Sequence, residues 1–263
     1  MKTLLIVTLL LILVLPTLCA SPCRGDCQFN TVTSVSGVNL SWDDCSASLG
    51  LGLNKTSTCQ SNTESAKTMY GSYVLPQDVD ALVGNDIVLD IFTNSATLPC
   101  WWNFTIAPRS MSYDMVFDAV CPDNNGVGIV DYWSSTPGGP MGGSVAALLP
   151  TSAVPRIRIR GVVTVDESQA QPVPATNEEL YSFTFRIRHE ATVGACTGCL
   201  VAACVILESI SVTQSNSPSI ELASPASRDR VFWQGGAIQA PGCLPCPCAT
   251  ENKSWGAVKA LYR

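Results

Sequence analysis

The sequence predicts an all-β fold: an antiparallel β-sandwich or jelly roll with disulfides and one short C-terminal helix. Apolar and polar residues alternate over several short segments, turn-forming residues interrupt these segments often, and helical periodicity is scarce. Hydrophobic residues make up 46% and charged residues 14% of the 263 positions, which excludes a charge-rich disordered chain. The 21 Asp and Glu outnumber the 15 Lys and Arg, so we expect no nucleic-acid partner.

The first twenty residues have the pattern of a secretory signal peptide. Lys2 supplies a positive charge, residues 4–15 form an apolar run, and the small Ala20 offers a cleavage point, with cleavage after Cys19 as an alternative. The run is shorter than the roughly 20 residues of a membrane-spanning helix, and no later stretch approaches that length. We therefore expect residues 1–20 to be a leader and the protein to be secreted, periplasmic or associated with the cell surface, without a transmembrane segment.

Strand signals follow in order along the mature chain. Val38, Leu40 and Trp42 alternate with Asn39 and Ser41, which predicts a half-buried strand. The same reasoning predicts strands at 70–75, 86–92, 110–118, 156–165, 181–188 and 201–212.

Helical signals are confined to two places. Residues 145–149 are expected to make one helical turn before Pro150, and residues 254–262 carry apolar side chains at helical spacing. No linker divides the chain, so we expect one β-sandwich domain over 21–240. A Cys/Pro connector and the short helix then occupy 241–263.

Twelve cysteines lie beyond the leader, an even number that in an oxidising compartment predicts disulfides. Spacing does not fix the connectivity, although proximity favours Cys45 with Cys59 and Cys100 with Cys121. The CxxC pairs at 196–199 and 243–246 suggest a zinc site or a redox motif. They lie far apart for a shared zinc site, and they lack the βαβ context of a redox motif. We expect no metal and no cofactor. The disulfide candidates are Cys23, Cys27, Cys45, Cys59, Cys100, Cys121, Cys196, Cys199, Cys204, Cys243, Cys246 and Cys248.

Several segments resemble parts of uncharacterised exported Cys-rich bacterial proteins. The segments are 86–104, 156–165, 180–188 and 196–204, and the closing residues 252–263, NKSWGAVKALYR, are similar to the characteristic ending of those proteins. The resemblance covers most of the mature chain and implies export without any established activity. A more distant likeness links DIVLDIF (86–92) and YSFTFRIR (181–188) to the core-flanking strands of cohesin-type and carbohydrate-binding jelly rolls.

Two pairs of neighbouring aromatic residues are candidates for a ligand surface. Trp101 precedes Trp102, and Trp133 follows Tyr132 in a Gly-rich loop. Exposed rings can stack on sugars. Because neighbours on a strand face opposite sides, Trp101 and Trp102 are not expected to be buried together. The alternative is that one ring of each pair enters the core and the other shields a loop or disulfide.

Five arginines are a second candidate surface. Arg156, Arg158 and Arg160 share one face of a strand, and Arg186 and Arg188 share one face of another. If these strands are neighbours, the guanidinium groups form a basic patch for an anionic glycan or for carboxylates of a partner. The alternative is a solvated face balanced by acidic side chains.

Catalytic patterns are weak. His189 is the sole histidine, and we expect it to be a surface residue at the end of a strand. Paired carboxylates can hydrolyse glycosides without histidine. The candidates for such a pair are Asp43, Asp44, Asp114, Asp118, Glu178 and Glu179.

Oxygen-rich loops add two further candidates. Residues 123–126 with Asp131 offer oxygen ligands for calcium without the EF-hand spacing. Sequons occur at Asn39, Asn54, Asn103 and Asn252, and for a bacterial source we interpret them as coincidental.

The sequence thus predicts an exported, non-enzymatic β-sandwich with a binding or surface-structural role. Its expected partner is an extracellular glycan or a cell-surface protein. The alternatives are a carbohydrate-binding module that uses the Trp and Arg surface and, behind it, a glycoside hydrolase. Oligomeric state is left open.

Overall fold

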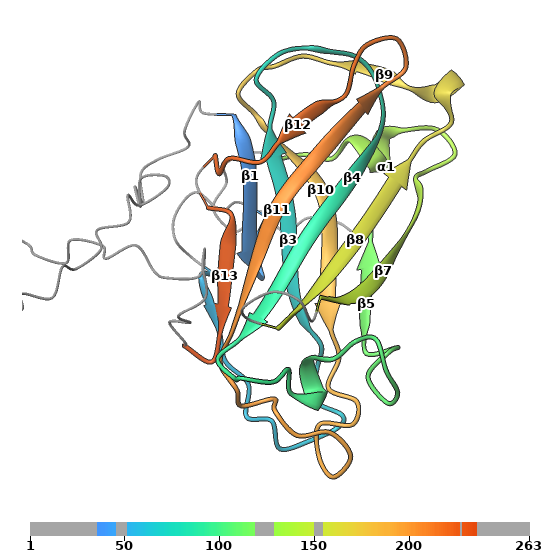
Figure 1. The fold of residues 1–263 in the computed structure, drawn as a ribbon. Helices are drawn as coiled ribbons and strands as arrows, with labels where there is room; N and C mark the ends of the chain where they lie inside the picture. Colours follow the sequence, from blue (N-terminus) through green and yellow to red (C-terminus); the bar gives the residue numbers. More distant parts are fainter. Residues whose placement is uncertain (1–35, 46–51, 119–128, 150–154, 227, 236–263) are drawn as a thin grey trace, which may run out of the picture.

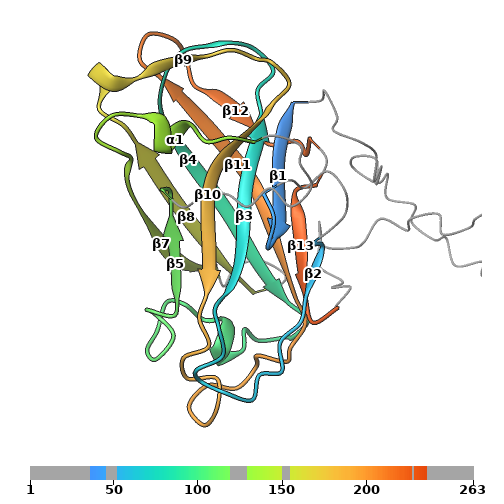
Figure 2. The same ribbon diagram turned by 180° about the vertical axis from the view of Figure 1, so that it is seen from behind.

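The computed structural model describes residues 36–45, 52–118, 129–149, 155–226 and 228–235. These residues form two β-sheets that face each other, so the predicted all-β sandwich is confirmed (Figures 1 and 2). The leader, the Cys/Pro connector and the C-terminal helix lie outside the described residues. Within the described ranges, no helix is long and apolar enough to cross a membrane.

The two sheets differ in size, and each contains one parallel strand pair. The small sheet has the order β1 (Gly37–Trp42), β3 (Lys67–Val74), β10 (Glu179–Ile187) and β5 (Tyr113–Val116), and β6 (Ile129–Val130) runs parallel to β10. The large sheet has the order β2 (Asn54–Lys55), β13 (Arg230–Trp233), β11 (Ala203–Gln214), β4 (Val79–Thr93), β8 (Arg156–Thr164) and β7 (Met141–Leu149). Strand β12 (Ile220–Leu222) pairs with β11, and β9 (Gln171–Val173) pairs with β4.

Helical structure in the described part is limited to short turns. They are the 3-10 turns Cys100–Trp102 and Glu167–Gln169 and the single α-helical turn α1 (Tyr132–Ser135). The strands themselves follow the expected alternation. In β4, Ile87, Leu89 and Ile91 are fully buried between the sheets, while Asp86 and Asp90 occupy the alternate positions on the other face of the strand, where Asp90 is also fully buried.

Close packing of the core requires glycine at two positions. The ring of Phe183 lies where a side chain at residue 71 would begin, because a Cβ on Gly71 would sit 2.0 Å from it. A Cβ on Gly161 would meet the sulfur of Met115 at 2.2 Å. Phe183 belongs to β10, the neighbouring strand of the same sheet, whereas Met115 belongs to the opposite sheet. Side chains thus fill the space above both glycine backbones, as close-packed interiors require.

The predicted half-burial of the first strand is wrong, because both faces of β1 are covered. Asn39 and Ser41 are as buried as their apolar neighbours. Asn39 donates to the Glu179 carboxylate at 3.0 Å, and the Arg228 guanidinium donates to the Ser41 hydroxyl at 3.1 Å. The polar side of the strand is therefore a buried hydrogen-bonded layer.

Two other segments differ from expectation, and a third agrees with it. Residues 145–149 are not helical but belong to β7, because main-chain pairing with β8 overrides a weak local preference. The strand expected at 110–118 shrinks to β5, and Met111, which the alternation assigns to the apolar face, is 77% exposed. The segment 201–212 forms one long strand, β11.

Candidate functional site

Three loops from distant parts of the sequence meet at one end of the sandwich (Figure 1). They are residues 56–66, 94–112 and 188–202, and we call this region the braced end. The Cys59–Cys199 disulfide joins the first loop to the third, and Cys100–Cys196 joins the second to the third. The third loop is therefore covalently tied to both of the others.

These bonds overturn the local pairing predicted for Cys59 and Cys100. Residues 59 and 199 are 140 positions apart, and residues 100 and 196 are 96 apart. The cysteines of the 196–199 CxxC thus bond to two different loops, which excludes a redox dithiol within that motif.

Other cysteines are bonded too. Cys45 and Cys204 are also disulfide-bonded. Disulfides are typical of proteins in oxidising compartments, among them secreted and periplasmic proteins. The candidates Cys23, Cys27, Cys121, Cys243, Cys246 and Cys248 lie outside the described residues.

Trp101 and Trp102 are both fully buried, contrary to the prediction. They lie on a 3-10 turn rather than on a strand, so the rule that neighbours face opposite sides does not apply. Their ring centroids are 4.8 Å apart, and Trp101 stacks on Trp233 at 5.3 Å. Trp133 is equally buried in α1 at the other end of the sandwich, where its indole donates to the Ser182 carbonyl at 3.0 Å. The three tryptophans form no common surface.

Arg109 ties the second loop to the third. Its guanidinium lies 4.5 Å from the Trp101 ring centroid, and Nε donates to the Trp101 carbonyl at 2.9 Å. Another nitrogen donates to the carbonyls of Arg188 and Glu190. Burial lowers the pKa of Arg109 to about 10, so the group is still charged at neutral pH.

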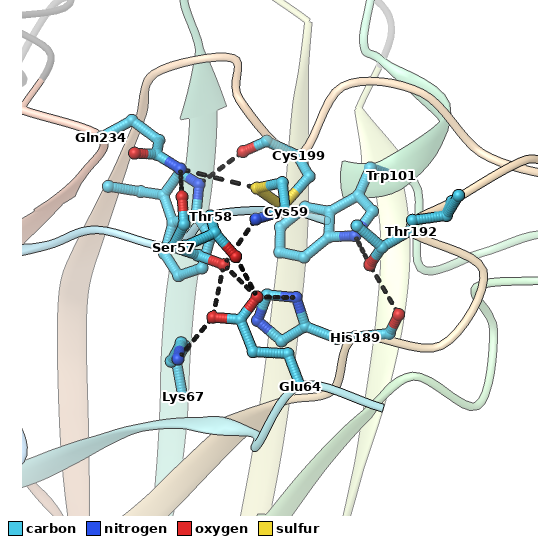
Figure 3. The surroundings of a disulfide bond; sticks show 12 residues. Ser57, Thr58, Cys59, Glu64, Lys67, Trp101, His189, Thr192, Cys199 and Gln234 are labelled. Atoms are coloured by element: carbon cyan, nitrogen blue, oxygen red, sulfur yellow. Dashed lines mark hydrogen bonds and ion pairs between the residues drawn. A yellow bond between two sulfur atoms is a disulfide. The ribbon is translucent and has the colours of Figure 1, made fainter. Parts of the chain in front are cut away.

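His189 is buried rather than exposed, which corrects the sequence expectation. Its ring packs beside Trp101 at 5.7 Å and Trp233 at 6.1 Å, and its side chain has no exposed surface (Figure 3). Neither ring nitrogen has a hydrogen-bond partner, and Nδ1 lies 3.6 Å from a Glu64 oxygen. Burial lowers the pKa of His189; the negative charge of Glu64 acts against this shift, and the positive charges of Lys67 and Arg109 act with it.

Glu64 is the charged neighbour of this histidine. It receives hydrogen bonds from Ser57 at 2.8 Å and from Lys67 at 2.8 Å (Figure 3). Desolvation acts to raise its pKa, but these bonds prevail and lower the pKa of Glu64 to about 2. Nothing in the sequence pairs Glu64 with His189, and the only available signal was that the chain contains one histidine.

The surface of the braced end is positioned by further bonds. Val193 donates its backbone N–H to Asn62 at 2.7 Å, and the Asn62 amide donates back to the Val193 carbonyl at 3.3 Å. The large apolar side chains exposed on these three loops are Ile106, Met111, Val193 and Leu200.

The five arginines do not form one patch. Arg156, Arg158 and Arg160 lie on β8 of the large sheet, whereas Arg186 lies on β10 of the small sheet and Arg188 directly follows it. The supposition that their strands are neighbours is therefore wrong.

Each arginine is also paired with an aspartate. Asp90 on β4 receives two bonds from Arg158, at 2.8 and 2.7 Å, and an ion pair from Arg156 at 3.2 Å. Arg160 pairs with Asp86 at 2.6 Å. On the other sheet, Arg186 and Arg188 pair with Asp114 at 3.4 and 3.3 Å. Such cross-strand pairs balance the charge of each face.

Most of the carboxylates suggested for glycoside hydrolysis have partners among the described residues. Asp114 binds the two arginines of the small sheet, Glu179 lies in the buried layer beside β1, and Asp43 forms an ion pair with Lys55. Glu178 accepts a hydrogen bond from Thr176. Asp44 is buried and Asp118 is exposed.

The calcium and sequon candidates lie in different environments. Asp131 caps α1 by accepting from the Ser134 N–H, and residues 123–126 lie outside the described part. No cluster of three potential metal ligands occurs among the described residues. The sequon residue Asn39 is buried, Asn54 is exposed, Asn103 accepts from Thr105, and Asn252 is outside the described part.

Sequence comparisons identify no relative of this chain, and structural comparison gives one weak likeness. No protein-family model matches the sequence, and no curated protein matches it. Among solved structures, the chain is similar to a type III cohesin module from the cellulosomal ScaE cell-surface anchoring scaffoldin of Ruminococcus flavefaciens. The identity is 8%, the TM-score is 0.27, and the match covers 82% of this chain and 96% of that one. The fold therefore rests on the strand pairings, and the resemblance to exported Cys-rich proteins stays a prediction.

Proposed function

We propose that this chain is an exported, non-enzymatic binding protein and that the braced end is its recognition surface. One observation carries the proposal: three loops far apart in sequence are tied together by two disulfides. Loops held by a rigid scaffold are frequent binding sites. Loops fixed before binding also avoid the ordering entropy that flexible loops lose on association.

A protein partner fits this end better than a glycan. The tryptophans that could stack on sugar rings are buried, whereas Ile106, Met111 and Leu200 are exposed. Apolar side chains at the centre of a protein interface contribute much of its affinity. The sole histidine is buried, and two of the candidate carboxylates, Asp43 and Asp114, are ion-paired, which supports a role without catalysis.

Retention on cells of the source organism tests this proposal. The labelled mature protein, with its disulfides intact, should bind to intact cells, and protease treatment of the cells should abolish binding. The double variant Ile106→Ser/Leu200→Ser should lose at least tenfold in retention, because both side chains are exposed on the braced end.

A matched control is available on the large sheet. Val145→Ser/Val162→Ser alters two exposed valines on β7 and β8, and it should bind like the parent. Equal retention of both double variants would refute the braced end as the binding surface. Retention that survives protease, together with signals on a glycan array, would point to a glycan instead.

A further inference from the structure

His189 of the third loop lies beside residues of the other two loops of the braced end. Its ring lies between elements of different origin: Trp101 from the second loop, Trp233 from β13 and Glu64 from the first loop. The side chain has no solvent contact, and neither nitrogen donates to or accepts from a neighbour. A neutral ring in this site contributes chiefly by packing.

We propose that protonation of His189 in acid loosens the loops of the braced end and thereby regulates its binding. We call this loosening the acid release. A charge in this site would have no hydrogen-bond acceptor other than a slightly distant Glu64 oxygen, at 3.6 Å. The other charged groups near the ring, Lys67 of β3 and Arg109 of the second loop, are positive and oppose a further positive charge. Water can solvate the imidazolium only if the loops separate.

The direction of the pH effect follows from proton linkage. Because the folded protein binds this proton less readily than the unfolded chain, the stability that His189 provides is complete at high pH. It is lost as pH falls below the ordinary histidine value of 6.5. Glu64, whose pKa is about 2, weakens the same region only in stronger acid, below its ordinary value of 4.5. The two groups therefore act in separate pH windows.

The single histidine makes the first test direct. Its ring protons give one set of imidazole signals in an NMR titration of the full mature protein, with no assignment problem. We expect the signals to titrate below pH 6.5. Titration at or above 6.5 would overturn the proposal, because the folded protein would then bind the proton at least as readily as the unfolded chain.

Hydrogen exchange supplies the second test. From pH 7 to pH 5, after correction for intrinsic rates, the opening constant of amides in 188–202 should rise by up to about tenfold per pH unit. Amides of β4 and β8 should not change. His189→Phe keeps an aromatic ring without a titratable group and should remove the pH dependence, whereas His189→Gln should also remove it if the phenylalanine variant folds poorly. Persistence of the full pH dependence in both variants would refute a role for this residue.

The inference rests on the proposed function only in its claim about binding. If the loops open with acid but the Ile106→Ser/Leu200→Ser variant binds normally, the release exists and the binding surface is elsewhere. If that variant loses binding while His189 titrates at 6.5 or above, the binding surface stands and the acid release fails.

Discussion

The two ends of the sandwich are stabilised in different ways. At the braced end, disulfides and a cluster of stacked rings connect the loops. At the opposite end, hydrogen bonds hold the loops: the Asp78 carboxylate accepts from the Ala175 N–H at 2.7 Å, and the Ser217 hydroxyl donates to Asp80 of β4 at 3.0 Å. Segments 75–78, 165–178 and 214–219 contain no cysteine. There the Tyr132 hydroxyl donates to the Leu82 carbonyl at 2.7 Å and accepts from the Gln171 N–H at 2.8 Å.

We infer from this contrast that the braced end is the more rigid end of the sandwich. Hydrogen bonds contribute about 0.5–1.5 kcal/mol each and can open one at a time. A disulfide restricts the unfolded chain, and a large buried ring adds apolar area and close packing. The braced end, which has two disulfides and a cluster of buried rings, is the end for which we propose a binding role.

Trp101→Ala should give the largest loss of stability. The substitution leaves a cavity beneath the loops and removes the ring that faces Arg109, whose guanidinium would stay buried. We expect the free energy of unfolding to fall by about 3–5 kcal/mol in urea titrations. Ile106→Ala, in the same loop but half exposed, is the control and should change it by less than about 0.5 kcal/mol. A small effect of Trp101→Ala would show that the ring cluster does not support this end.

Removal of the Cys59–Cys199 disulfide should have the next largest effect. The double variant Cys59→Ala/Cys199→Ala should lose about 2–4 kcal/mol of unfolding free energy, because a long loop of the unfolded chain is released. Hydrogen exchange should increase in loops 56–66 and 188–202 but not in 165–178. An equal increase at both ends would contradict the view that the two ends are stabilised independently.

The sequence predicted the strands of the two sheets better than the loops at the ends of the sandwich. Alternation located β4, β8 and β10 because apolar side chains recur at every second position of these strands, and this period is visible in the residues themselves even though the polar side of β10 is buried too. It failed for β1 because Arg228 and Glu179, remote in sequence, cover the polar face.

The site could not be predicted for a similar reason. Disulfide connectivity depends on which loops meet in space, and proximity in sequence selected the wrong partners for Cys59 and Cys100. The burial of Trp101 and Trp102 depends on a 3-10 turn that local patterns did not reveal. His189 acquires its properties from Trp101 and Glu64, which a one-dimensional pattern does not associate with it.

Tyr132→Phe tests the opposite end and should give the smallest effect. The change removes one hydroxyl and leaves the Leu82 carbonyl and the Gln171 N–H without this partner, while the ring still packs in place. We expect a loss of about 1–2 kcal/mol in the free energy of unfolding. Tyr70→Phe is the control, since the Tyr70 hydroxyl makes no hydrogen bond with the described residues, and it should be nearly neutral. If Tyr132→Phe instead matched Trp101→Ala, the hydrogen-bonded end would be as strongly organised as the disulfide-bonded one, and covalent bracing would no longer distinguish a recognition surface.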